Sequence, residues 1–329
     1  MDRLRVGTLG AARITPAALI KPARQVPEVT VTAVAARDPA RAREFAARHG
    51  IAVVHDSYEA LIADPEINAV YNPLPNSLHA PWTLRAIAAG KHVLCEKPFT
   101  SNEAEAQEVA AAAKSAGIVV VEAFHYRYHP LARRMLDAVA EIGKLRHVEA
   151  AVAFPLPRFS DIRYQFDLAG GATMDAGCYP INCIRLLAQD EPTVVSARAA
   201  LHGPVVDRAM VADFLFPGGA TGRIVTSLWS RNLLRLGARA VGERGEMRVF
   251  NYLAPQAFNL LTVRAGGRTR RERVRGEATY TYQLRAFAAA VLRGEPVLTT
   301  PEDAVANMRQ IDAVYRAAGL PLRGTAPTE

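Results

Sequence analysis

Hydrophobic and polar residues follow two different patterns along this chain, and the change comes near residue 125. In the first third, short hydrophobic runs alternate with amphipathic stretches, and Gly, Pro, Asp and Ser residues punctuate them. Strands that alternate with helices indicate parallel pairing, because each parallel connection needs a crossover. The predicted strands are residues 4–9, 29–36, 67–72, 92–95 and 118–123. We therefore expect an α/β domain with a parallel sheet over residues 1–123.

The helix signals in this region are clearest after the second predicted strand. Asp38 is an N-cap residue, Pro39 suits the first helical position, and Gly50 suits the end of the helix. Ser57 is placed to cap a further short helix. Helices are also expected to begin near residues 13–15 and to cover residues 58–63, 78–89 and about 101–117.

After residue 125 the alternation has the two-residue period of half-buried strands. The predicted strands are residues 145–154, 193–201, 209–216, 221–229, 235–241, 246–250 and 259–264, with helices at about 130–140, 176–188, 281–293 and 302–318. This series is typical of an α+β domain with a mainly antiparallel sheet. We expect this domain to span residues 124–329 and to leave one sheet face open. Through that face we expect a homo-oligomer, either a dimer or a tetramer.

Composition places the chain among ordinary globular proteins, with 50% hydrophobic and 22% charged residues. No hydrophobic run approaches the ~18 residues of a membrane span. The N-terminus also lacks the hydrophobic core of a signal peptide. The sequence therefore predicts a soluble cytoplasmic protein with no membrane partner. Its three cysteines are too few for a disulfide framework.

The formal net charge of +8 raises the question of nucleic-acid binding. The basic residues are mostly scattered arginines, and only residues 264–275 form a cluster. Gly266 and Gly267 lie within that cluster, so a hairpin with solvated arginines accounts for it. The sequence has no recognition module for DNA or RNA. We expect no nucleic-acid partner, although a basic surface also attracts anionic cofactors and substrates.

The turn after the first strand has one of the three glycines of a dinucleotide-binding loop. Its small residues allow backbone amides to approach a pyrophosphate at a helix N-terminus. The turn reads Gly10-Ala11-Ala12-Arg13-Ile14-Thr15. An ordinary tight turn is the alternative, but its position inside a β-α series favours a cofactor site. We therefore expect a Rossmann-type domain whose cofactor-binding residues include Gly10, Ala12, Arg13 and Ile14.

The end of the second strand bears on the choice between NADP and NAD. An acidic residue there binds a ribose 2′-hydroxyl, whereas an arginine accepts a 2′-phosphate. Asp38 already serves as a helix cap, but Arg37 has no such local task. We therefore expect NADP as the cofactor, with NAD as the alternative. Arg13 and Arg41 could assist Arg37.

Three polar segments follow predicted strands at the edge where a dinucleotide fold binds its ligand. They are residues 73–79, residues 96–98 and residues 122–130. Lys97 is notable because lysine is rare in this chain. Unlike arginine, lysine can lose its proton in a protein. A salt bridge to the adjacent Glu96 is the alternative interpretation.

Together these segments resemble the Gfo/Idh/MocA oxidoreductases, the family of glucose–fructose oxidoreductase and inositol dehydrogenase. The resemblance covers nearly the whole chain and rests on the turn at Gly10 and on motifs in a fixed order. These are Pro75-Asn76-x-x-His79, Glu96-Lys97-Pro98, Gly170-Gly171-Ala172-Thr173-Met174-Asp175-Ala176-Gly177-Cys178-Tyr179, Tyr282-Gln283-Leu284-x-x-Phe287 and Asn307-Met308-x-x-Ile311-Asp312-Ala313. Tyr179 stands where many members have histidine. This version is similar to the branch of dimeric dihydrodiol dehydrogenases, NADP-linked D-xylose dehydrogenases and some sugar ketoreductases, which prefers NADP.

The resemblance implies roles for several residues. Lys97 would lie near the nicotinamide, and Asp175 would be the acid of the D-x-G-x-[H/Y] motif. The residues implied at the cofactor site are Pro75, Asn76, His79, Glu96 and Lys97, and those implied at the substrate pocket are Arg127, Arg163, Asp175, Tyr179 and Asn182. An ordinary ion pair is the alternative for Arg127 and Arg163.

Hydride transfer from an alcohol carbon needs a group that takes the hydroxyl proton or returns it. A free tyrosine, with a pKa of ~10, is a poor base at neutral pH, but a lysine cation favours the phenolate. We expect Tyr179 to be the catalytic acid/base and Lys97 its electrostatic partner, or the reverse. Asp175 would orient the substrate hydroxyl or the lysine. A spacing of four puts Asp175 and Tyr179 on one helix face, with Asn182 one turn further on.

The sequence thus predicts NADP-dependent hydride transfer with a secondary alcohol or ketone of a sugar or a cyclic trans-diol. One alternative is a reductase of nucleotide-bound keto-sugars. Another is a dinucleotide-sensing regulator of the same fold that has no catalytic activity. His79, His125 and His129 are loosely spaced and lack a carboxylate cluster, so we expect no metal site.

Overall fold

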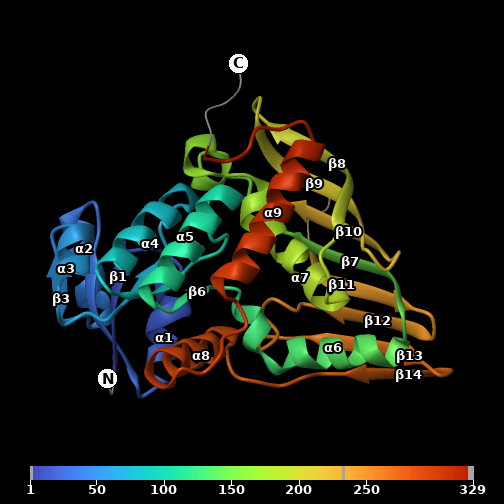
Figure 1. Cartoon of the computed structure of the whole chain (residues 1–329), viewed down its shortest axis with the longest axis horizontal. Helices are drawn as coiled ribbons and strands as arrows, with labels where there is room; N and C mark the ends of the chain where they lie inside the picture. The colour runs from blue at the N-terminus through green and yellow to red at the C-terminus, as the bar shows by residue number, and fades with distance from the viewer. Residues whose placement is uncertain (1–2, 232–233, 325–329) are drawn as a thin grey trace. The chain divides into compact units, whose positions relative to one another are not determined.

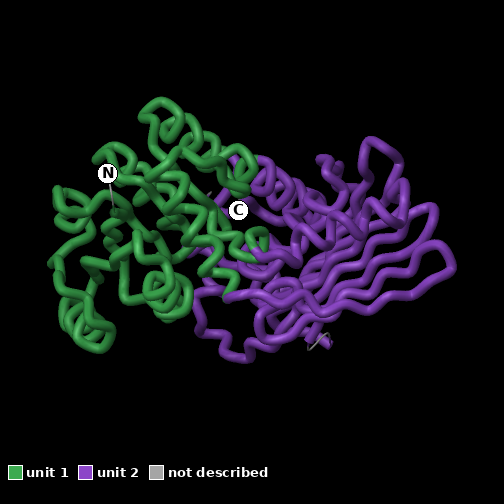
Figure 2. The backbone as a smooth tube through the Cα atoms, turned by 90° about the horizontal axis from the view of Figure 1, so that it is seen from below, with its two compact units in different colours: residues 1–100, 104–128, 278–305 green, residues 101–103, 129–277, 306–329 purple. Residues whose placement is uncertain are grey.

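The structure is a computed structural model that describes residues 3–231 and 234–324. The chain forms two compact units, and neither is continuous in sequence (Figure 2). Unit 1 comprises the chain up to Thr100, Ala104–Tyr128 and Ala278–Val305, and unit 2 comprises Ser101–Glu103, His129–Glu277 and the chain from Ala306 onward. The sequence analysis expects a single boundary between residues 123 and 124, whereas residues 278–305 belong to the N-terminal unit.

Unit 1 contains a six-stranded sheet in which every neighbouring pair is parallel. Its strands are β1 (Leu4–Leu9), β2 (Val29–Ala35), β3 (Val53–His55), β4 (Ala69–Asn72), β5 (His92–Cys95) and β6 (Val120–Glu122). Their order is β3-β2-β1-β4-β5-β6, in which the direction of winding reverses between β1 and β4. This is the doubly wound dinucleotide-binding order, so the predicted Rossmann-type domain is confirmed. The sequence analysis misses only β3, because three exposed or half-buried residues carry too little pattern.

Two helices of unit 1 begin directly after the residues that the sequence predicts as their caps. Asp38 caps α2 (Pro39–His49), and Gly50 ends it with a positive φ of 70°. Ser57 caps α3 (Tyr58–Ala63). The other helical segments are η1 (Pro16–Ile20), α1 (Lys21–Ala23), η2 (Asn76–Leu78), α4 (His79–Ala88), α5 (Glu103–Ala116), η3 (His125–Tyr128) and α8 (Thr279–Arg293).

Helix α8 explains why unit 1 includes a late part of the chain. Leu284 and Phe287 of α8 are buried in the same hydrophobic core as Leu4 and Val6 of β1. The amphipathic pattern of α8 shows that one face is buried but not against which core. The sequence analysis therefore groups it with the second domain.

Unit 2 contains an eight-stranded sheet of order β14-β13-β12-β11-β7-β10-β9-β8. Its strands are β7 (Leu145–Ala153), β8 (Thr193–His202), β9 (Val206–Leu215), β10 (Thr221–Ser227), β11 (Arg235–Gly242), β12 (Gly245–Phe250), β13 (Leu260–Ala265) and β14 (Arg268–Glu272). Neighbours in the described residues are antiparallel, except that β7 and β10 are parallel. The predicted α+β domain is confirmed. The hairpin predicted at Gly266 and Gly267 joins β13 to β14.

The helices of unit 2 pack on its sheet (Figure 1). Helix α6 (Pro130–Ile142) lies against β12 and β13, and α7 (Cys178–Ala188) lies against β7 and β10. Helix α7 continues from a π-helical turn, η6 (Thr173–Gly177). The other helical segments are η4 (Ile162–Tyr164), η5 (Phe166–Leu168) and α9 (Pro301–Ala317), which belongs to unit 2 from Ala306 onward.

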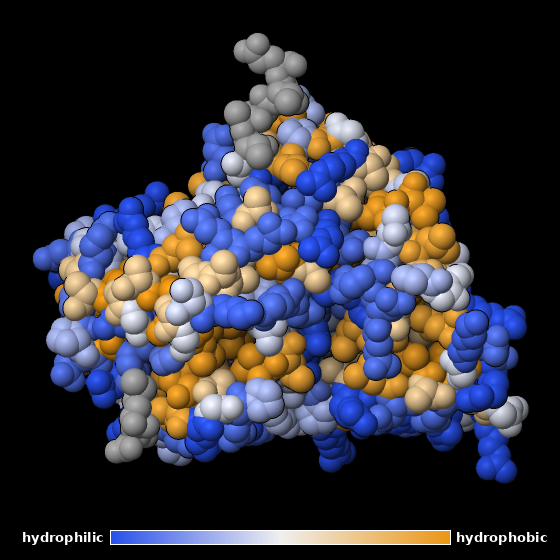
Figure 3. All heavy atoms as spheres, in the orientation of Figure 1, coloured by the Kyte–Doolittle hydropathy of each residue, from blue (hydrophilic) through white to orange (hydrophobic). Residues whose placement is uncertain are grey.

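The described part of the chain has no helix that is both long enough and hydrophobic enough to cross a membrane. Hydrophilic side chains are spread over the face of the molecule shown in Figure 3, and they interrupt its hydrophobic patches.

Candidate active site

The turn after β1 has the geometry of an anion-binding loop. Gly10 has a φ of +86°, and its N–H donates to the carbonyl of Ala35 at 2.6 Å. A Cβ at Gly10 would come within 3.3 Å of the Leu74 side chain, so only glycine fits without a shift. Thr15, just before η1, has a buried hydroxyl with no hydrogen-bond partner within the described residues. A positive-φ glycine and an unpartnered hydroxyl before a helical turn fit the phosphates of a dinucleotide.

Two neighbouring charged residues at the end of β2, Arg37 and Asp38, differ in their surroundings. The Asp38 carboxylate accepts hydrogen bonds from the N–H groups of Ala40 at 2.9 Å and Arg41 at 3.3 Å. It therefore serves α2 as the predicted cap. The Arg37 side chain is exposed. The Arg37 cation and its backbone both act to lower the pKa of the Tyr58 phenol, although burial raises that pKa more.

The segment after β4 is joined to the segment after β5 by one histidine ring. His79 Nδ1 lies 2.7 Å from the carbonyl oxygen of Pro98, and its Nε2 lies 2.7 Å from that of Leu74. Burial lowers the pKa of His79 to about 4, although both carbonyls favour the protonated ring. Because both ring nitrogens face backbone oxygens, they are not available to a ligand. Pro75 and Asn76 lie on the same loop and are half-buried.

Glu96 and Lys97 follow β5 directly. Glu96 is buried, and its carboxylate accepts a hydrogen bond from the Tyr71 hydroxyl at 2.8 Å. Lys97 is half-buried, and its cation lowers the pKa of both His79 and His125. The ammonium group therefore lies within electrostatic reach of a histidine from each neighbouring strand end.

The segment after β6 is fixed by contacts with α8 and α9. His125 Nδ1 lies 2.8 Å from the Thr279 hydroxyl, and its ring centroid lies 4.1 Å from that of Tyr280. Burial, with a smaller contribution from Lys97, lowers the pKa of His125 to about 3. Arg127 Nη1 forms an ion pair with Asp303 at 3.1 Å. Of the two roles open to Arg127 in the sequence, its geometry in unit 1 is that of an ion-pair partner.

In unit 2, the structure brings Asp175 and Arg163 together. Arg163 Nε lies 2.8 Å from Asp175 Oδ2, and Arg163 Nη1 lies 3.1 Å from Asp161 Oδ1. Asp175 lies on η6, and Tyr179 lies in the first turn of α7. Pro180 is tolerated there because a first turn needs no backbone donor. Tyr179 is 8% exposed, whereas Asn182 is completely buried.

The sequence analysis missed the residues that hold this segment of unit 2 in place. Asp207 and Arg323 are buried and contact the loop that leads to Asp175. They are separated by 116 residues in sequence. A contact between residues so far apart leaves no local pattern in the sequence. The one indication of a structural role was an arginine, Arg323, within a segment of small and apolar residues.

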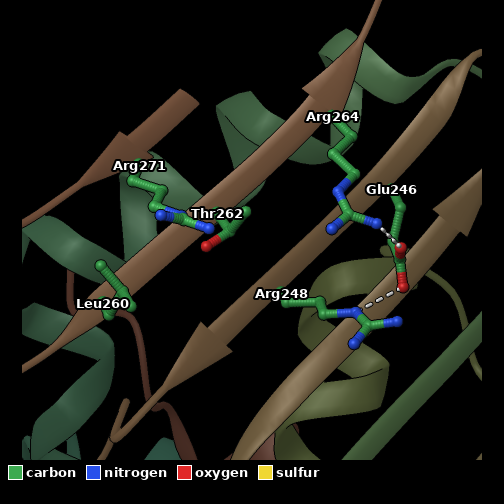
Figure 4. A pocket seen from close by; sticks show the side chains of 6 residues that line it. All are labelled: Glu246, Arg248, Leu260, Thr262, Arg264 and Arg271. Carbon is green, nitrogen blue, oxygen red and sulfur yellow. Dashed lines mark hydrogen bonds and ion pairs between the residues drawn. The ribbon is translucent and has the colours of Figure 1, made fainter. Parts of the chain in front are cut away.

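A hollow on the sheet of unit 2 is lined by three arginines and one carboxylate (Figure 4). Its side chains come from three neighbouring strands. Glu246 accepts from Arg248 at 2.7 Å and lies 4.0 Å from Arg264. The lining residues are Glu246, Arg248, Leu260, Thr262, Arg264 and Arg271. Within the residues that the structure describes, no three His, Cys, Asp or Glu side chains are grouped to hold a metal ion.

Two family models match successive parts of the chain. Residues 4–124 match the model of an oxidoreductase family with an NAD-binding Rossmann fold, GFO/IDH/MocA, and residues 131–248 match the GFO/IDH/MocA C-terminal domain. A D-xylose 1-dehydrogenase (NADP(+)) of Haloferax volcanii is 38% identical over 314 residues, which are 95% of this chain and 96% of the relative.

Two further proteins show the range of this group. The trans-1,2-dihydrobenzene-1,2-diol dehydrogenase of Mus musculus is 35% identical over 234 residues, covering 69% of this chain and 68% of the relative. The crystal structure of a 3-ketoreductase from Actinomadura kijaniata, in complex with NADP and TDP-benzene, is 29% identical. It has a TM-score of 0.87 and covers 96% of this chain and 98% of its own.

Proposed function

The chain belongs to the Gfo/Idh/MocA oxidoreductase family of NAD(P)-dependent enzymes acting on CH–OH groups, and on that premise we propose the following reaction. The protein transfers a hydride between NADP and a secondary alcohol or ketone of a sugar or cyclic trans-diol. The observation that carries the proposal is the pairing of Asp175 with Arg163 in the turn that leads into Tyr179.

The preference for NADP rests on the end of β2. The carboxylate of Asp38 is occupied by two backbone N–H groups of α2, so it is a poor acceptor for a ribose 2′-hydroxyl. The exposed Arg37 supplies a cation for a 2′-phosphate instead. The name of the Haloferax volcanii relative also specifies NADP(+).

The glycine turn would hold the pyrophosphate. Backbone N–H groups after Gly10 approach the phosphates, and Thr15 adds a buried hydroxyl. Ala12 leaves room for that approach, and Arg13 and Ile14 are exposed at the start of the helical turn. On the neighbouring loops the proposed cofactor contacts are Pro75, Asn76 and Glu96, with His79 acting through the two carbonyls that it joins.

Tyr179 is our candidate for the group that moves the hydroxyl proton. The bound nicotinamide supplies hydride acceptance or donation. The phenol oxygen of Tyr179 takes the proton of the alcohol during oxidation and returns it during reduction. A cation beside the phenol favours the phenolate, and Lys97 is the proposed cation. Lys97 belongs to unit 1 and Tyr179 to unit 2, so their pairing stays a prediction.

Asp175 would orient the substrate. Its ion pair with Arg163, at 2.8 Å, holds the carboxylate in place. A carboxylate only accepts hydrogen bonds, so it can hold a sugar hydroxyl by its proton. The Arg163 side chain is 40% exposed, which leaves guanidinium donors for a substrate oxygen. The completely buried Asn182 would support the helix face that carries Asp175 and Tyr179.

Two measurements test the proposal. The first titrates NADPH and NADH and then follows NADP-coupled oxidation of a panel of aldoses and trans-dihydrodiols. The second compares Tyr179→Phe with Tyr252→Phe, a buried tyrosine of unit 2 that follows β12. Tyr179→Phe should lose most turnover while NADPH still binds, whereas Tyr252→Phe should keep turnover. Unchanged turnover in Tyr179→Phe contradicts its assignment as acid/base.

A reductase of nucleotide-bound keto-sugars is the second candidate. The similarity to the NADP- and TDP-benzene-bound 3-ketoreductase favours it. Tight binding of TDP or UDP with no activity on free aldoses would support this candidate. Cofactor binding with no turnover of any substrate would support a dinucleotide-sensing regulator instead.

We also propose that copies of the chain associate through the sheet of unit 2. Phe250 and Leu260 are cross-strand partners on the face opposite the buried Met247 and Leu261, and both are exposed. Leu215 of β9 is also exposed. Light scattering should give a mass above one chain for the native protein. Leu260→Arg should reduce that mass, and a native protein with the mass of one chain contradicts the proposal.

A further inference from the structure

Two buried side chains grip the backbone that leads to Asp175. Asp207 of β9 accepts hydrogen bonds from the Thr173 N–H at 2.7 Å and from the Thr173 hydroxyl at 2.6 Å, both at Oδ2. Arg323, beyond the end of α9, donates from Nε to the carbonyl of Gly170 at 2.6 Å. The two side chains also contact each other, with Arg323 Nη2 3.0 Å from Asp207 Oδ1. We call these two residues the loop clamp.

The loop clamp is fully buried and well satisfied. Both side chains are 0% exposed. Arg323 also donates to the carbonyls of Pro321 at 2.9 Å and Val205 at 3.3 Å. The Tyr315 hydroxyl donates to Asp207 Oδ1 at 2.9 Å, and the guanidinium lies 4.2 Å from the Tyr315 ring centroid. Burying two charges is costly, and these further hydrogen bonds offset part of that cost.

Gly170 and Gly171, in the loop that leads to Asp175, leave no room for a side chain. Gly171 has a φ of +140°, and a Cβ there would lie 2.2 Å from Asp207 Oδ1 and 2.7 Å from the Tyr315 hydroxyl. A Cβ at Gly170 would lie 2.8 Å from the carbonyl oxygen of Arg163. No side chain fits between this backbone and its surroundings, so the clamp touches the main chain itself.

The clamped backbone is bonded directly to the Asp175–Arg163 pair. The Asp175 N–H donates to the carbonyl of Gly171 at 3.0 Å, and the Gly171 N–H donates to the carbonyl of Arg163 at 2.8 Å. The same short stretch therefore fixes the main chain of both partners. Their side chains then meet at 2.8 Å.

We propose that Arg323 and Asp207 are positioning residues for the Asp175–Arg163 pair, so that the C-terminal segment of the chain completes the active site. This rests on the proposed function, in which Asp175 orients the substrate. The clamp touches neither substrate nor cofactor and acts only through the loop. If the loop shifts, the carboxylate moves away from the substrate hydroxyl, and the rate falls because a misplaced group no longer holds a reactive geometry.

The test uses Arg323→Lys, which keeps the positive charge but loses the forked set of donors. We expect kcat to fall at least tenfold, while the affinity for NADPH changes less than twofold. In Arg323→Ala, added guanidinium ion should restore part of kcat, which a merely unstable protein would not show. Arg134→Lys is the matched control, because Arg134 is an ion-paired arginine of unit 2 that holds β14 through Glu272. It should keep full turnover and show no guanidinium effect.

Hydrogen exchange gives a readout that does not depend on activity. The Thr173 amide, which donates to Asp207, should exchange at least tenfold faster in Arg323→Lys than in the native protein or in Arg134→Lys. Faster exchange together with the loss of kcat supports the proposal. Native-like exchange and a kcat within twofold of native, in folded Arg323→Lys and Arg323→Ala, overturn it.

If both Arg323 variants fail to fold, Tyr315→Phe tests the proposal instead. It removes one hydrogen bond to Asp207 Oδ1 at nearly constant volume. A fall in kcat of several-fold with faster Thr173 exchange supports the clamp, and native values of both overturn it. Failure of the proposed function is distinguishable, since Tyr179→Phe would then keep its turnover whatever the Arg323 variants do.

Discussion

Arg41 of α2 donates from Nη2 to the carbonyl oxygen of Ala11 at 2.9 Å and so ties the helix to the glycine turn. Arg37, four residues earlier, has an exposed side chain. The two arginines near the end of β2 therefore do different things. Arg41 supports the turn that any dinucleotide would use, and Arg37 is the residue that we propose for the 2′-phosphate of NADP.

Arg37→Ala should weaken NADPH binding by one to two orders of magnitude and leave NADH binding nearly unchanged, because hydrogen bonds to charged groups are among the stronger ones. Arg41→Met should weaken both cofactors by a similar factor, because the turn loses its support. Fluorescence titration with NADPH and NADH measures all four affinities. A selective loss of NADPH in Arg41→Met would instead assign Arg41 to the 2′-phosphate.

The Asp175–Arg163 ion pair predicts strong coupling between two substitutions. Asp175→Asn and Arg163→Gln should each lower kcat/KM by about a hundredfold, since each removes the orientation of the substrate. The double variant should be only slightly worse than either single one, because residues that act as a unit are not additive. Steady-state kinetics of the four proteins measures the coupling. Fully additive losses would mean that the two residues act independently.

The two buried histidines of unit 1 predict a pH-dependent stability. His79 and His125 have their pKa lowered to about 4 and about 3 by burial, whereas both would titrate near 6.5 in the unfolded chain. Below pH 6.5 the unfolded state therefore binds protons that the folded state does not. The free energy of unfolding should fall as the pH falls, by about 1.4 kcal/mol per pH unit for each histidine once it is fully protonated in the unfolded chain.

Urea unfolding at pH 7, 6 and 5 measures this slope. His125→Asn removes one titrating group and keeps a side chain that can hydrogen bond to Thr279. Its stability should therefore decline less between pH 7 and pH 5 than that of the native protein. An equal decline in both proteins would show that His125 is protonated in the folded state.

Gly171 predicts a contrast between two glycine substitutions of unit 2. Gly171→Ala should lower the free energy of unfolding by about 3–5 kcal/mol, because the methyl group meets Asp207 and Tyr315 in a buried network. Gly219→Ala is the control, since Gly219 also has a positive φ, of +83°, but a Cβ there meets nothing within 4 Å. It should lose only about 1–2 kcal/mol, the cost of the backbone conformation alone. Similar losses in a denaturant titration would contradict a crowded site at Gly171.

Local signals in the sequence predicted most of the fold. The two-residue and three-to-four-residue periods are set by which face of an element is buried, so they give strands and helices directly. Asp38 and Ser57 cap the helices that they were expected to cap, because capping depends on neighbours two or three residues away. The turn at Gly10 follows the first strand where the sequence places it, and its glycine has a positive φ.

The contacts that complete the site join residues far apart in sequence, and periodicity holds no information on them. Arg127 pairs with Asp303, which lies 176 residues later, and Asp207 pairs with Arg323, 116 residues later. The sequence left the choice between substrate contact and ion pair open for Arg127. Only the fold of unit 1, which includes α8 and the start of α9, provides its partner.

The arginine-rich hairpin has a consequence for how the sheet of unit 2 ends. Strand β14 lies at the outer edge of that sheet and consists of Arg268-Thr269-Arg270-Arg271-Glu272 (Figure 1). Arg270 and Glu272 turn back to charged partners on α6, and Arg268 and Arg271 remain exposed. An uncapped strand edge invites a further strand from another molecule, and a row of like charges repels it. The excess of positive charge on β14 thus disfavours edge-to-edge pairing of this sheet with another molecule, which is one route to aggregation.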